Sequence, residues 1–140
     1  MSQPFGDPAC LFCRIGRREI PAKIAFENDP VLAFHDVAPK APTHVLVIPK
    51  EHVTALSGTT AAHAEALGAC LTAARDLARA LGLSSYRVVA NDGPDAGQSV
   101  FHLHFHVLPR YHGRELRLHA GVMADPAVLA DHAARIRAAL

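Results

Sequence analysis

Tryptophan is absent from this 140-residue sequence, and aromatic residues make up only 6% of it. The chain also lacks an apolar run of membrane-spanning length and an N-terminal basic stretch followed by an apolar one. We therefore expect no membrane span and a cytoplasmic location. The formal net charge of only +1 gives no general electrostatic reason to expect nucleic acid or a membrane surface as a partner.

Cysteine is scarce as well. The three cysteines cannot all pair with one another, and a cytosolic protein would keep them reduced. Cys70 falls inside a helical apolar pattern and is expected to be a small core residue. Cys10 and Cys13 form a C-x-x-C pair. A thioredoxin-like redox motif would follow a strand, and none is predicted here, so half of a zinc site and chance spacing remain as interpretations.

What the sequence does contain is enough apolar material for a core. Half of its residues are apolar and 19% are charged, which excludes a disordered chain and favours one domain over 1–140. Residues 10–16 are compatible with a short helical turn. Helical spacing predicts helices over 60–81 and 126–140, with Ser57 or Thr59 capping the long one and Gly82 ending it. Residues 1–8 are expected to form a loose arm.

Apolar runs and alternations predict strands over 24–27, 31–35, 43–49, 86–91 and 97–109. The first two are expected to form a hairpin through Asn28-Asp29-Pro30. Strands and helices do not alternate as βαβ units do. The expected fold class is therefore α+β: an antiparallel β-sheet with a long helix and shorter helices packed on it.

The last of these strands carries the most informative pattern. In an extended chain His102, His104 and His106 share one face, and the other face holds Phe101, Leu103, Phe105 and Val107. Protonated imidazoles this close would repel one another, so the arrangement favours neutral rings. A neutral imidazole is what a nucleophile, a general base or a metal ligand requires.

The sequence His-Leu-His-Phe-His-Val-Leu, preceded by Gly97-Gln98-Ser99, resembles the signature of the histidine-triad (HIT) nucleotide hydrolases and transferases. The resemblance covers about residues 10–110, and residues 111–140 form a C-terminal loop and helix beyond it. It implies a homodimer, a purine nucleotide or nucleoside monophosphate as ligand, and His104 as nucleophile toward the α-phosphorus. His106, Gln98 with its backbone N–H, Ser99 and Asn91 would then stabilise charge on the phosphoryl oxygens.

The same resemblance assigns further pocket residues. Asp36 would accept hydrogen bonds from the ribose, and Gly97 belongs to the turn that contacts the phosphate. An apolar slot for the base would consist of Leu11, Phe12, Ile15, Ile20 and Phe34, although ordinary core packing explains these five equally well.

The C-x-x-C pair resembles the start of the family's zinc-containing bacterial branch. That resemblance implies a structural zinc ion bound by Cys10, Cys13, His44 and His102, a closed Cys2His2 set. A catalytic zinc ion on the triad itself is the alternative. Alternate residues of a flat strand converge poorly on one ion, which argues against it.

The expected function is hydrolysis at the α-phosphate of a nucleoside phosphoramidate or nucleotide anhydride through a nucleotidyl-histidine intermediate. Two alternatives stay open. The first is a dinucleoside polyphosphate hydrolase that uses the same residues, and the second is a catalytically silent nucleotide-binding or interaction module. The C-terminal extension leaves the preference between the two substrate classes open.

Overall fold

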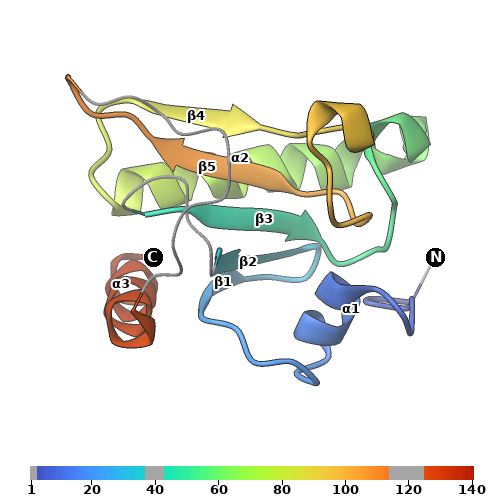
Figure 1. Ribbon diagram of the computed structural model, residues 1–140, viewed down its shortest axis with the longest axis horizontal. Helices are drawn as coiled ribbons and strands as arrows, with labels where there is room; N and C mark the ends of the chain where they lie inside the picture. Colours follow the sequence, from blue (N-terminus) through green and yellow to red (C-terminus); the bar gives the residue numbers. More distant parts are fainter. Residues whose placement is uncertain (1–2, 37–42, 114–124) are drawn as a thin grey trace.

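The computed structural model describes residues 3–36, 43–113 and 125–140 (Figure 1). Within these ranges five antiparallel strands form one sheet in the order β1-β2-β3-β5-β4. The bounds of the strands are β1 Ile24–Glu27, β2 Val31–His35, β3 Val45–Pro49, β4 Tyr86–Val89 and β5 Phe105–Pro109. The expected antiparallel α+β fold is confirmed. Most of the C-terminal loop expected before the helix over 126–140 lies outside the described residues.

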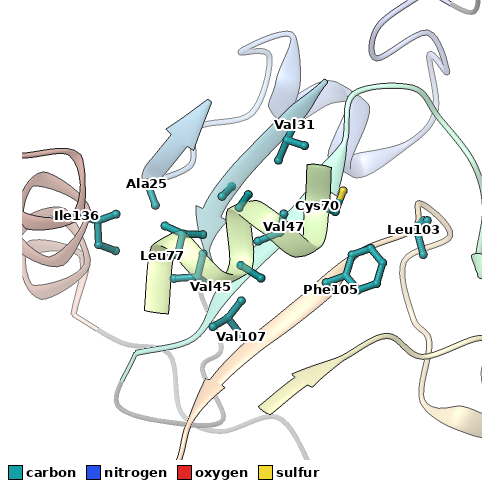
Figure 2. Packing of buried hydrophobic residues seen from close by; sticks show 13 residues of the cluster. Ala25, Val31, Val45, Val47, Cys70, Leu77, Leu103, Phe105, Val107 and Ile136 are labelled. Carbon is teal, nitrogen blue, oxygen red and sulfur yellow. The ribbon is translucent and has the colours of Figure 1, made fainter. Parts of the chain in front are cut away.

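The long helix α2 (Ala64–Ala80) covers one face of the sheet, and α3 (Pro126–Ala139) lies beside β1 (Figure 1). The core between the sheet and these helices holds the strand residues Val31, Val45, Val47, Phe105 and Val107. Cys70 and Leu77 of α2 point into it, and Ile136 brings α3 against Ala25 of β1 (Figure 2). Cys70 is fully buried, as a core residue should be, and burial raises the pKa of its thiol to about 12.

The opposite face of the sheet is covered by the short helix α1 (Leu11–Gly16). Phe12, Cys13 and Ile15 of α1 pack with the other set of strand side chains, which comprises Leu32, Phe34, Leu46 and Ile48. Phe5 belongs to the same cluster, and its backbone N–H donates to the carbonyl of Lys50 (2.7 Å). The prediction of a loose arm over 1–8 is therefore wrong for Phe5, because an apolar ring this close to α1 is buried rather than left in water.

The triad segment is less regular than predicted. β5 begins only at Phe105, and the chain from Gly97 to His104 bends outside the sheet. Leu103 donates its N–H to Val53 rather than to a neighbouring strand (2.7 Å). Leu103, Phe105 and Val107 face the α2 core as expected, but Phe101 is 47% exposed because it precedes the strand. The prediction of one continuous strand over 97–109 is therefore wrong for residues 97–104.

The helix ends follow ordinary capping chemistry with one change. The start of the long helix is a 3₁₀ turn, η2 (Ala61–His63), capped by Thr60 rather than by Ser57 or Thr59. Ser57 lies within the 3₁₀ turn η1 (Leu56–Gly58), and its backbone N–H and hydroxyl donate to the Asp92 carboxylate. Gly82 ends the helix with a φ of +66°, a conformation that glycine adopts without strain. No helix in the described ranges is long and apolar enough to span a membrane.

Candidate active site and metal centre

A cavity of about 280 Å³ opens between α1, the end of β2 and the loop before β5. The helix α1 and the loop containing the 3₁₀ turn η3 (Pro94–Ala96) lie at the same end of the sheet (Figure 1). All five residues of the expected apolar slot line the cavity, and so do these other expected site residues: Asp36, Gly97, Ser99, His104 and His106. Phe12 meets Phe34 edge to face, with ring centroids 5.2 Å apart. The structure thus brings apolar and polar candidates around one space.

His104 is fixed by a hydrogen bond to the backbone of its own segment. Its Nδ1 lies 2.7 Å from the carbonyl oxygen of His102, and only a protonated Nδ1 can donate to a carbonyl. The neutral ring therefore has its lone pair on Nε2. Phe12 packs edge to face against the same ring with a centroid distance of 5.1 Å. His104 is consequently buried and oriented, with its lone pair at one defined atom.

His106 contacts a histidine from a different strand end. Its Nδ1 lies 2.7 Å from Nε2 of His44, and Nδ1 of His44 lies 3.6 Å from the carboxylate of Asp36. The three side chains form a continuous polar row, with both histidines buried. A carboxylate at one end favours the tautomers with a proton on each Nδ1, so that Nδ1–H of His106 donates to His44 and Nδ1–H of His44 points toward Asp36.

The loop before the triad is held together by Gln98, which corrects the expectation for that residue. The Gln98 side chain accepts from the N–H of Gly93 (2.9 Å) and donates to the carbonyls of Thr54 (2.7 Å) and Val100 (3.1 Å). Its backbone N–H donates to the carbonyl of Gly93 (3.1 Å). These bonds occupy the groups expected to contact phosphate, so Gln98 shapes the loop rather than the transition state.

Of two other residues expected to contact the phosphate, Ser99 lines the cavity and Asn91 does not. Ser99 lines the cavity and is exposed, so its hydroxyl is accessible to a ligand. Asn91 does not line this cavity. Its side-chain amide nitrogen lies 3.7 Å from where a Cβ on Gly97 would be, and Gly97 has a φ of +94°. Asn91 thus lies next to the turn, and a side chain at position 97 would strain the backbone because of its positive φ.

A separate cluster of four residues with metal-ligating atoms lies next to His104 and includes His102. Cys10, Cys13, His52 and His102 place one such atom each within 4.8 Å of all the others. Nδ1 of His102 is 3.4 Å from the sulfur of Cys10 and 3.6 Å from that of Cys13. Nδ1 of His52 is 3.6 Å from the sulfur of Cys13 and 3.2 Å from Nδ1 of His102. Two sulfurs and two imidazole nitrogens are a donor set suited to tetrahedral zinc.

The structure therefore replaces His44 by His52 in the expected ligand set. The reason is the antiparallel register of β3 and β5, in which Leu46 pairs with His106 and Val47 pairs with Phe105. His44, just before β3, is consequently beside His106. His102 lies beyond the other end of β3 and donates from Nε2 to the carbonyl of Pro49 (2.8 Å), three residues before His52. A five-residue strand is about 17 Å long, so His44 and His52 cannot join the same site.

Burial favours the uncharged forms of two of these ligating groups. Burial raises the pKa of the Cys13 thiol to about 11 and lowers the pKa of the His102 imidazole to about 4. Both shifts arise because each charged form would lose contact with water. A bound divalent cation would favour the thiolate by displacing its proton, and the neutral imidazole already has the lone pair that a ligand needs.

Comparison with known proteins agrees with this geometry. The chain is 50% identical over 99 residues to an uncharacterized HIT-like protein of Synechococcus elongatus, with 70% of this chain and 87% of the relative covered. It is 45% identical over 105 residues to a 14 kDa zinc-binding protein of Zea mays, covering 73% and 82%.

Two solved structures show the same fold. A Zn-bound histidine triad family protein of Mycobacterium smegmatis superposes with a TM-score of 0.80 at 32% identity, covering 94% of this chain and 92% of the other. A HIT family hydrolase of Clostridium thermocellum superposes with a TM-score of 0.74 at 39% identity, covering 80% and 99%. The model of the HIT domain family matches residues 17–113, which include His104, His106 and the loop before them. The chain belongs to the HIT, or histidine triad, family.

Proposed function

We propose that this protein hydrolyses nucleotides at the α-phosphorus, taking a nucleoside phosphoramidate or a nucleotide anhydride through a nucleotidyl-His104 intermediate. The observation that supports this most directly is the 2.7 Å contact between Nδ1 of His104 and the carbonyl of His102. It leaves the lone pair on Nε2 of a buried ring that lines the cavity, together with the apolar side chains of α1 and the exposed Ser99. The name of the Clostridium thermocellum hydrolase supports the reaction class.

In the first step, Nε2 of His104 forms a bond to phosphorus, and the bond from phosphorus to the leaving nitrogen or oxygen breaks. The electron pair of that bond goes to the leaving atom, which takes up a proton as it departs. Nδ1 keeps its proton, and the carbonyl of His102 stabilises the positive charge that develops on the ring. In the second step, water attacks phosphorus, the P–N bond to His104 breaks, and nucleoside monophosphate and the free imidazole are released.

We assign His106 to proton transfer and to the phosphoryl oxygens. Because Asp36 favours Nδ1–H on His44, Nε2 of His44 accepts from Nδ1–H of His106, and Nε2 of His106 exchanges a proton with the substrate. Ser99 lines the same cavity and would donate to the leaving atom. Asp36 has two carboxylate oxygens, so its contact with His44 is compatible with accepting the ribose hydroxyls.

A turnover panel tests this proposal. An adenosine phosphoramidate and a diadenosine polyphosphate should both be offered, because they share the α-phosphorus and differ only in the leaving group. His104→Ala should abolish turnover while nucleoside monophosphate still binds, and wild-type protein quenched during turnover should carry an acid-labile nucleotidyl group on His104. The matched control is His112→Ala at an exposed histidine, which should behave as wild type.

The outcomes of the panel separate the alternatives. Preference for the polyphosphate would make the protein a dinucleoside polyphosphate hydrolase working through the same residues. Binding of nucleotide without turnover of either substrate would indicate a silent binding module. Turnover by His104→Ala at a rate near that of wild type would overturn the mechanism.

The four-residue cluster supports a second part of the proposal, a structural zinc ion. Cys10, Cys13, His52 and His102 would bind it, and four protein ligands leave no open position for a substrate. When bound, the ion would link α1 to the loop after β3 and to the triad segment. The names of the maize relative and of the mycobacterial structure support the choice of zinc.

We also propose that the protein forms a homodimer through β4 and α2. β4 is the edge of the sheet, and Val88 pairs with Val107, whose side chain packs on the α2 side. Val88 and Tyr86 nevertheless remain 37% and 38% exposed, and Leu71 of α2 is 51% exposed. An edge strand with exposed apolar side chains and an exposed apolar residue on the helix that covers the sheet together favour pairing with a second copy.

A further inference from the structure

We propose that Asp7 is the positioning residue of the metal centre and that it acts on the ion through His52. This inference rests on the proposed zinc site and adds a residue outside the four ligands. Asp7 lies three residues before Cys10, in the arm that precedes α1. Its carboxylate lies 3.5 Å from Nε2 of His52.

The two ring nitrogens of His52 have separate surroundings. Nδ1 faces the cluster, 3.6 Å from the sulfur of Cys13 and 3.2 Å from Nδ1 of His102. Nε2 faces the carboxylate of Asp7. A histidine that binds a metal through Nδ1 must carry its proton on Nε2, and a carboxylate beside Nε2 stabilises that tautomer and makes the ligating nitrogen more basic.

His102 shows the same arrangement with a weaker partner. Its Nδ1 also faces the two sulfurs, and its Nε2 donates to the carbonyl of Pro49 (2.8 Å). Both imidazoles are therefore oriented toward one point by Nδ1 and held from behind at Nε2. Asp7 supplies the charged member of the two supports. Its negative charge lies next to a site where a cation would sit, which further favours metal binding.

Asp7 is itself held in place by the chain that leads to the cysteines. One carboxylate oxygen accepts from the N–H of Ala9 (2.8 Å) and from that of Cys10 (3.1 Å). The other oxygen is the one that faces His52. A single side chain thus fixes the backbone at the first thiol ligand and the ring of an imidazole ligand. The two roles use different oxygens, so they can be separated by substitution.

The test compares Asp7→Asn with Asp7→Ala in the full-length chain. Asparagine keeps a side-chain oxygen for the N–H groups of Ala9 and Cys10 but removes the charge that faces His52, whereas alanine removes both. Zn²⁺ affinity is measured by competition with a chromophoric chelator. We expect Asp7→Asn to lower the affinity roughly 10- to 100-fold and Asp7→Ala to lower it at least as much. Asp131→Asn, an exposed carboxylate of α3, is the matched control and should bind zinc as wild type does.

A second readout follows the tautomer of His52. Nitrogen NMR of the zinc-loaded wild type should show a protonated Nε2 on His52 whose shift moves in Asp7→Asn, which a role confined to the backbone turn would not produce. Wild-type affinity in Asp7→Asn together with an unchanged His52 Nε2 shift would overturn the inference and leave the zinc site intact. Failure of the wild type to bind zinc, with Cys13→Ser behaving identically, would instead overturn the proposed metal site and this inference with it.

Discussion

The imidazoles of His44 and His106 are in direct contact, with Nε2 of one 2.7 Å from Nδ1 of the other. The residues are 62 positions apart in the chain, and the pairing of Leu46 with His106 across β3 and β5 brings them together. His44 therefore lies behind His106, which lines the cavity, and its position 3.6 Å from Asp36 gives His106 a link to a carboxylate.

The first prediction separates the two histidines that flank β3. His44→Ala should lower kcat by roughly ten- to a hundredfold, since it weakens proton transfer by His106 without removing it, and zinc content should stay unchanged. His52→Ala should instead lose the zinc. Steady-state kinetics and elemental analysis on the same two preparations check this. Loss of zinc in His44→Ala would restore the ligand set inferred from the sequence.

The second prediction concerns the stoichiometry and stabilising effect of the metal. Purified protein should contain about one zinc per chain, and Cys13→Ser should lose the metal together with thermal stability, because the ligands link α1 to two other segments. Cys70→Ser is the control, since Cys70 is buried in the α2 core and should retain the metal despite losing stability. Metal-free wild type with the melting temperature of Cys13→Ser would contradict the prediction.

The third prediction is the pH dependence of stability caused by His35. This side chain is 1% exposed, and both of its ring nitrogens lack a hydrogen-bond partner among the described residues. Burial, aided by the nearby His132 and Arg137, lowers its pKa from 6.5 to about 4. Between these values the unfolded chain binds a proton that the folded chain does not, so stability falls as pH falls from 6.5 toward 4.

That linkage amounts to up to about 3 kcal/mol across the window. His35→Leu should flatten this part of the pH–stability curve measured by urea unfolding, whereas His112→Leu, at an exposed site, should leave the slope as it is. A slope in His35→Leu equal to that of wild type would show that other groups cause the acid destabilisation.

The fourth prediction distinguishes a structural Gln98 from a catalytic one. Gln98→Ala leaves Gly93 and Thr54 without their side-chain partner and should lower the free energy of unfolding by roughly 1 to 3 kcal/mol. Ser99→Ala changes an exposed hydroxyl and should slow turnover with little change in stability. Denaturant titration and kinetics on both variants check this, and a Gln98→Ala protein as stable as wild type would contradict it.

The fifth prediction tests the dimer. Light scattering should give a mass of about twice the 15.0 kDa of one chain. Val88→Lys places a charge on the exposed edge of β4 and should shift the mass toward that of a monomer. Val128→Lys makes the same change on the exposed face of α3 and should not. A wild-type mass near 15 kDa at working concentration would rule the dimer out.

Much of the fold follows from local pattern. The hairpin of β1 and β2, the apolar run of β3 and the spacing in α2 are all properties of short windows, and each element forms close to its predicted bounds. The predicted strand over 97–109 fails in its first half for a physical reason. Gln98 and Leu103 bond to Thr54 and Val53, which belong to a segment that no local pattern connects with them.

Local sequence pattern also predicts only part of the site. The residue types around His104 could be inferred from the triad and the preceding turn. The choice between His44 and His52 depends on which end of β3 faces α1, a tertiary property. One signal was available: in an antiparallel sheet with the third and fifth strands adjacent, the histidine before β3 must lie near the last triad histidine and the histidine after β3 near the first.

The position of α1 has a consequence for how the molecule opens. A helix of six residues cannot persist alone in water, so its order depends on Phe5, on the strand residues beneath it and on the proposed zinc ligands at its start. Residues 3–20 should therefore exchange their amide hydrogens as one cooperative unit once the metal is removed, while β3 and β5 stay protected. Because Phe12 and Ile15 also line the cavity beside His104, that opening would remove the apolar wall of the proposed nucleotide site and leave the His104 hydrogen bond to His102 in place.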